Sequence, residues 1–84
     1  MKPIYRIYTK VNYADTSRDP SDIHIEELGV TDNLEKAKQF SNDYIKNHFF
    51  RKNTELSEMT NGDFFAFDFC SWGKLLVIEK MKEL

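Results

Sequence analysis

Apolar and polar residues alternate along the first part of the chain. Residues 4–12, IYRIYTKVN, follow a period of two and are rich in β-branched and aromatic side chains. This pattern is typical of a β-strand with one buried face. The parity expected to face the core contains Tyr5, Ile7, Thr9 and Val11. The opposite parity contains Ile4, Arg6, Tyr8 and Lys10.

A second strand is predicted at residues 23–30, after a polar loop at residues 13–22 that contains Asp and Pro. Its alternation breaks in the middle, because Ile23 and Ile25 share one parity while the later apolar residues have the other. A β-bulge near Glu26–Glu27 would place both halves on one face. The two strands are therefore expected to be neighbours joined by a long loop.

An amphipathic helix is predicted over residues 33–50, where apolar residues recur with the 3.6-residue period. Asp32 is the predicted N-cap, because Glu35 follows at the spacing of a capping box. Phe50 falls off the apolar stripe, so the helix is expected to end near it. The predicted stripe contains Leu34, Ala37, Phe40, Ser41, Tyr44, Ile45, His48 and Phe49.

Residues 51–62 leave two alternatives open. Leu56 and Met59 are spaced for one short helical turn, whereas Asn61-Gly62 is a strong hairpin signal. A hairpin there would make residues 56–60 a strand.

The rest of the chain is predicted to form strands at residues 63–70 and 74–81, joined by a turn at residues 71–73. The order β-β-α-β-β predicts an α+β fold. We expect a small antiparallel sheet of about four strands with one amphipathic helix packed on one face, in a single domain spanning residues 1–84.

One helix covers only one face of a sheet. In each strand, alternate residues therefore lie either under the helix or on the face that the helix does not cover. Phe65, Phe67 and Phe69 are expected under the helix. The other face is then predicted to contain Phe64, Ala66, Asp68, Cys70 and Trp72. That face is more apolar than a solvated sheet requires, and exposed apolar patches usually mark interfaces. Three alternatives stay open: cover by a loop of this chain, a second copy, or a foreign protein.

Charge and cysteine content narrow the possible functions. The 84 residues include 12 basic and 14 acidic ones, a net charge of −2, which disfavours nucleic-acid binding by bulk charge. The lone cysteine excludes an internal disulfide and predicts a reduced thiol in the cytoplasm. The apolar runs are too short to span a membrane, and the first ten residues do not resemble a signal peptide.

Catalytic and metal-binding patterns are weak. His24, His48 and Cys70 lack partners at a usable spacing, and we expect His48 to be bonded to backbone at the edge of the core. Three aspartates in the first loop could hold a hard cation, but their spacing does not match an EF-hand and Arg18 lies among them. We therefore expect no catalytic residue, metal or cofactor. These aspartates are Asp15, Asp19 and Asp22.

The favoured hypothesis is a non-catalytic protein–protein interaction domain, acting through the sheet face away from the helix and binding a protein partner or itself as a homodimer. Aromatic and Arg residues are common anchors at such interfaces. Its candidate surface contains Arg6, Tyr8, Lys10, Phe64 and Trp72.

The alternative is a weak single-stranded nucleic-acid binder, which would use stacking and phosphate contacts. Its candidate residues are Arg6, Tyr8, Lys10, Lys46, Arg51 and Lys52.

Residues 29–40, GVTDNLEKAKQF, resemble a segment common in small bacterial and phage proteins. The resemblance carries no function with it, but a small α+β domain of this sort would fit an accessory protein of a phage or mobile element. The segment covers a strand end, a cap and the start of a helix, and it assigns no site residue.

Overall fold

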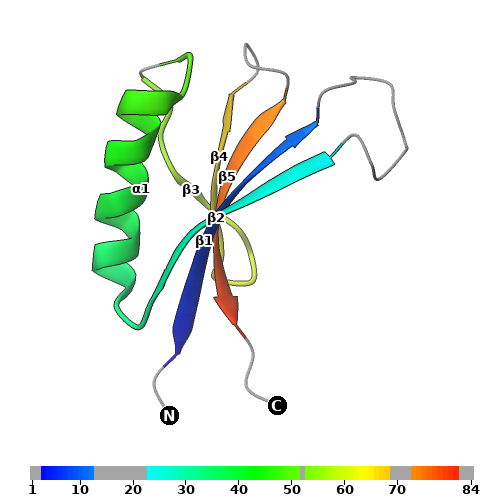
Figure 1. Ribbon diagram of the computed structural model, residues 1–84. Helices are drawn as coiled ribbons and strands as arrows, with labels where there is room; N and C mark the ends of the chain where they lie inside the picture. The colour runs from blue at the N-terminus through cyan, green and yellow to red at the C-terminus, as the bar shows by residue number, and fades with distance from the viewer. Residues whose placement is uncertain (1–2, 13–22, 52, 69–72, 82–84) are drawn as a thin grey trace.

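The computed structural model describes residues 3–12, 23–51, 53–68 and 73–81. These residues form five strands and one helix (Figure 1). In chain order the elements are β1 (Ile4–Asn12), β2 (Ile23–Thr31), α1 (Leu34–His48), β3 (Ser57–Glu58), β4 (Phe64–Asp68) and β5 (Lys74–Met81).

The strands form one sheet in the order β2-β1-β5-β4-β3, and every neighbouring pair is antiparallel. Helix α1 lies along one face of this sheet (Figure 1). The predicted α+β fold is confirmed, with one strand more than expected because β3 adds a short edge.

The pairing of β1 with β2 contains the irregularity that the sequence predicted. Ile7 pairs with Gly29, whereas the next residue, Tyr8, pairs with Glu27, so Leu28 is the extra residue of a bulge. Leu28 is partly buried and packs against the core. The bulge lies one residue beyond the predicted position, and it places Leu28 against the core while Ile25 and Val30 stay exposed.

The core lies between α1 and the face formed by alternate residues of β1, β4 and β5. Register places Ile7, Ile78 and Phe64 side by side on this face. Small helix residues, Ala37 and Ser41, are fully buried against it and let the helix approach closely. The buried apolar cluster contains Tyr5, Ile7, Ala37, Ile45, Phe49, Phe64, Ala66, Leu76 and Ile78.

The prediction for the orientation of β4 is wrong. Phe64, Ala66 and Asp68 face the helix and are buried, whereas Phe65 and Phe67 lie on the opposite face and are partly exposed. The reason is the register with β5: Phe64 pairs with Ile78, whose side chain belongs to the core, and paired residues point to the same face. The aromatic content of the strand did not decide its orientation.

The helix starts later and ends earlier than predicted. Its N-cap is Asn33, not Asp32: the Asn33 Oδ1 accepts from the backbone N–H groups of Glu35, at 2.9 Å, and Lys36, at 3.3 Å. Asp32 lies outside the helix because the Thr31 hydroxyl accepts from the Asn33 N–H at 3.1 Å and holds the turn before it.

The buried stripe of α1 is narrower than predicted. Ala37, Ser41 and Ile45 are buried, whereas Phe40 is 44% exposed and His48 is also exposed. Both exposed rings lie on one flank, where they stack on either side of Tyr44.

The hairpin alternative holds for residues 51–62, although its strand is only two residues long. The Gly62 N–H donates to the Met59 carbonyl at 3.1 Å, and the Met59 N–H donates to the Asp63 carbonyl at 2.7 Å. Gly62 has a φ of +85°, which a residue with a Cβ adopts at a cost. Of the predicted Asn61-Gly62 turn signal, Gly62 is therefore the residue that adopts the left-handed backbone conformation of the turn.

Candidate interaction face

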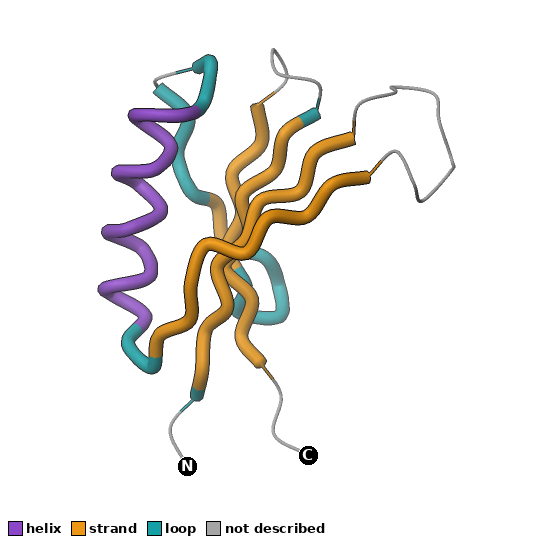
Figure 2. The backbone as a smooth tube through the Cα atoms, in the orientation of Figure 1, coloured by secondary structure: helices purple, strands orange, loops and turns teal. Residues whose placement is uncertain are grey.

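On the side of the sheet away from α1, no helix or strand of the described residues lies over the sheet (Figure 2). We call this side the uncovered face. Strand register assigns to it Ile4, Arg6, Tyr8, Lys10, Ile25, Glu27, Val30, Phe65, Phe67, Leu75, Val77, Glu79 and Met81.

The β5–β4 half of the uncovered face is apolar. One cross-strand row is Tyr8, Val77 and Phe65, and the next contains Leu75 and Phe67 beside Lys10. Val77 is only 5% exposed although no helix covers it, since larger side chains flank it on both neighbouring strands. The other apolar side chains of these rows are partly exposed. The result is a continuous surface of aromatic and aliphatic groups.

The β2–β1 half of the uncovered face combines a charged network with the exposed side chains of Ile25 and Val30. The Arg6 guanidinium forms an ion pair with the Glu27 carboxylate: its Nε donates to both oxygens at 2.9 Å, and a terminal nitrogen contacts Oε1. The same guanidinium lies 4.2 Å from the centroid of the Tyr8 ring, and a terminal nitrogen is 4.0 Å from a Glu79 oxygen. Arg6 is therefore held between two carboxylates and a ring.

The titration of these groups follows from their contacts. Hydrogen bonding to Arg6 lowers the pKa of the Glu27 carboxyl, and the same bond raises the pKa of Arg6. Burial raises the pKa of the Tyr8 phenol, and the nearby Glu79 carboxylate adds to the rise. The Tyr8 hydroxyl donates to Glu79 Oε2 at 3.3 Å, which favours the neutral phenol. At neutral pH the Arg6–Glu27 pair is therefore charged and the Tyr8 phenol is neutral.

The structure brings together some of the residues that the sequence predicted for this face. Arg6, Tyr8 and Lys10 lie in one line on β1, as expected from their parity. Phe64 does not belong to the face, because it is buried under the helix. Trp72 lies outside the described residues. Sequence reasoning missed Phe65 and Phe67, and the signal that could have found them is the pairing of β4 with β5.

The residues predicted for nucleic-acid binding do not form one surface. Lys46 is on the helix, on the opposite side of the sheet from Tyr8, and Arg51 follows the end of the helix. Lys52 lies outside the described residues. Because the guanidinium of Arg6 is already engaged with Glu27, a phosphate would have to compete for it.

The histidines sit in ordinary structural settings. His48 stacks on Tyr44, with 4.1 Å between ring centroids, and its Nδ1 lies 3.2 Å from the Tyr44 carbonyl oxygen. This confirms the prediction of a backbone-bonded histidine at the edge of the core. His24 is exposed on β2. In the described part of the chain, no three His, Cys, Asp or Glu side chains cluster closely enough to hold a metal.

The first-loop aspartates and Cys70 lie outside the described residues. Within the described ranges, no helix has the length and apolar content needed to cross a membrane. No protein-family model, curated protein or solved structure matches this chain.

Proposed function

We propose that the chain is a non-catalytic protein-interaction domain, and that the uncovered face binds a second copy of the chain. The observation that supports this most is the row of Tyr8, Val77 and Phe65, extended by Leu75 and Phe67, on a face over which no described helix or strand lies. Contiguous apolar surface of this kind usually marks an interface.

The size of the face suits a stable pair. The nine residues of β1 extend for about 30 Å, and four strand spacings add about 19 Å across the sheet. The product is roughly 570 Å² for each copy, so two faces would bury roughly 1,100 Å², just above the ~1,000 Å² that a specific interface requires.

The charges of the face favour a second copy over a strongly acidic or basic partner. Arg6 and Lys10 balance Glu27 and Glu79, so the face carries no net charge. A partner with charge of one sign would meet repulsion from half of these groups. A second copy brings the same balance and the same apolar half.

Self-association is preferred to nucleic-acid binding because the basic residues needed for the latter lie on two sides of the sheet. The cytoplasm is the proposed compartment, from the single cysteine. A phage or mobile-element setting stays a prediction that rests on analogy with other small α+β domains.

The test is the mass in solution by size-exclusion chromatography with light scattering, over a tenfold concentration range. We expect twice the mass of the 84-residue chain at the higher concentrations, and a single-chain mass for Phe65→Lys and Leu75→Lys. Phe40→Lys is the matched control, because Phe40 is an exposed aromatic residue on the helix. A single-chain mass at every concentration would contradict the proposal.

A further inference from the structure

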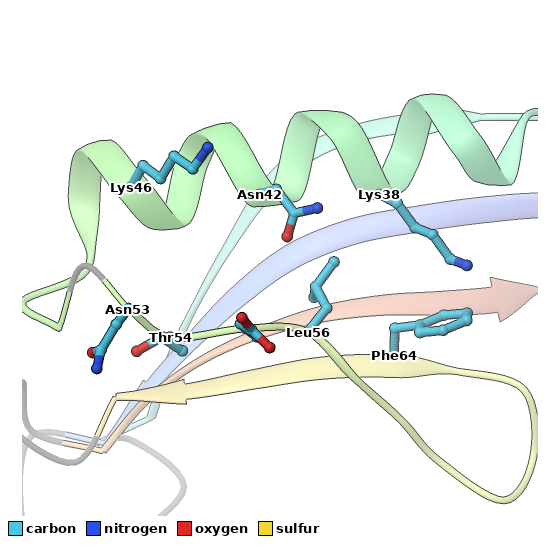
Figure 3. Close-up of a pocket in the computed structure, with 8 residues that line it drawn as sticks. Lys38, Asn42, Lys46, Asn53, Thr54, Leu56 and Phe64 are labelled. Carbon is cyan, nitrogen blue, oxygen red and sulfur yellow. The ribbon is translucent and has the colours of Figure 1, made fainter.

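A second surface feature lies on the helix side of the sheet. A groove of about 530 Å³ separates α1 from the chain segment at residues 53–56 (Figure 3). The two walls differ in kind: one is a helix face and the other is a stretch of chain without helix. Leu56 and Phe64 supply apolar surface between them.

The helix wall of the groove is cationic. Lys38, Asn42 and Lys46 follow one another at four-residue intervals, so they form one stripe along α1. Eight residues of helix place the first and last of them about 12 Å apart along the axis. In Figure 3 the side chains of Lys38 and Asn42 extend from the helix toward the groove, whereas the Lys46 side chain lies across the helix at the end of the groove.

Both ammonium groups are available to a ligand. Neither Lys38 nor Lys46 has a carboxylate within ion-pair distance in the described part of the chain. The Lys38 Nζ lies 4.5 Å from the centroid of the Phe64 ring, which fixes its position over the apolar surface. Glu55 on the opposite wall supplies one negative charge. The described lining is therefore net positive in a chain whose net charge is −2.

Amide side chains line both walls. Asn42 lies on the helix wall and Asn53 on the opposite wall. Each carries a carbonyl acceptor and an NH₂ donor, the same pair of functions that a peptide bond presents. An extended peptide could use both amides along its backbone, whereas a small inorganic anion could use only their donors.

We propose that this groove binds an extended acidic peptide segment of a partner protein. Its carboxylates would meet Lys38 and Lys46, and its backbone would meet the two amides. At about 3.3 Å per residue, the ~12 Å between the lysine positions corresponds to acidic residues four apart. The groove lies on the opposite side of the sheet from the uncovered face, so the proposal does not depend on self-association.

The test is an NMR titration with an acetylated, amidated five-residue peptide, Glu-Ala-Gly-Ala-Glu. We expect backbone amide shifts at Lys38, Asn42, Lys46 and Asn53. Lys38→Gln and Lys46→Gln should each weaken binding by about two- to five-fold, the range of an exposed ion pair. Circular dichroism shows whether each variant is folded, and Lys46 is exposed enough for its replacement to be tolerated.

Lys36→Gln is the matched control, because Lys36 is an exposed lysine of the same helix that does not line the groove. Its affinity for the peptide should be unchanged. Equal weakening in all three variants would mean a general charge effect and would overturn the proposal. Equal binding of the Gln-Ala-Gly-Ala-Gln peptide, or absence of shifts at the groove, would overturn it as well. Inorganic phosphate that binds as well as the peptide would replace it with a small-anion site.

Discussion

Both faces of this sheet carry apolar side chains, but those under the helix are buried and most of those on the uncovered face are partly exposed. Under the helix, Leu76 and Ile78 are completely buried against small helix residues. On the uncovered face, Phe65 and Phe67 present rings that no described helix or strand covers. Strand pairing, more than hydrophobicity, decides which apolar set becomes core. We call the face that packs against α1 the covered face. The difference suggests that the covered face stabilises the monomer and that the uncovered face is suited to a partner.

The largest expected effect comes from truncating one residue on each face. Ile78→Ala should lower the free energy of unfolding by about 2–5 kcal/mol, because it leaves a cavity in a fully buried site. Leu75→Ala, on the uncovered face, should cost less than half as much at low protein concentration. Urea unfolding measures both. Equal losses of unfolding free energy in the two variants would show that the two faces are equally buried, and would contradict the difference drawn between them.

A second variant tests how much the buried carboxylate of Asp68 contributes to the stability of the covered face. Asp68 is fully buried, and its Oδ2 accepts from the Phe50 backbone N–H at 2.6 Å, which fixes the chain just after the helix. Removing a hydrogen bond to a charged group should cost about 1.5–3 kcal/mol in Asp68→Ala. Asp68→Asn keeps one acceptor and should lose less. Unchanged urea unfolding of Asp68→Ala would mean that this contact does not hold the covered face together.

Asp68 also shows where sequence reasoning fails. Local patterns were sufficient for β1, β2, α1 and β5, because alternation and the 3.6-residue period are properties of a single segment. The orientation of β4 depends on the pairing of Phe64 with Ile78, two residues from different segments. Hydrophobic patterning alone would not place an aspartate on the core side. Asp68 is found there with its carboxylate bonded to the backbone N–H of Phe50, just after the helix.

The candidate site was predictable to a similar extent. Arg6, Tyr8 and Lys10 share a parity within one strand, so the sequence places them together. Phe65 was assigned to the wrong face because its orientation is set by a neighbouring strand. The groove was not predicted, since it depends on the position of the segment at residues 53–56 beside α1, and no local pattern specifies that.

The covered face also depends on a helix that is held at its first turn. Asn33→Ala removes the acceptor for two backbone N–H groups and should lower stability by about 1 kcal/mol. Asp32→Ala is the control, because Asp32 lies before the cap, and it should change stability by less than half of that. Thermal unfolding separates the two variants. A larger effect at Asp32 would restore the capping arrangement first predicted from the sequence.

The smallest expected effect concerns the charged half of the uncovered face. Because Arg6 lowers the pKa of Glu27 in the folded chain, the contribution of this pair is present above the ordinary value near 4.5 and is lost as pH falls through the lower folded value. Glu27 is exposed and Arg6 is partly exposed, so the effect on stability is small and weakens with salt. NMR titration of the Glu27 carboxyl should give a midpoint below 4.5 that rises in Arg6→Gln. An unchanged midpoint would mean that Glu27 does not hold Arg6, which would leave Glu79 and the Tyr8 ring as its contacts on the uncovered face.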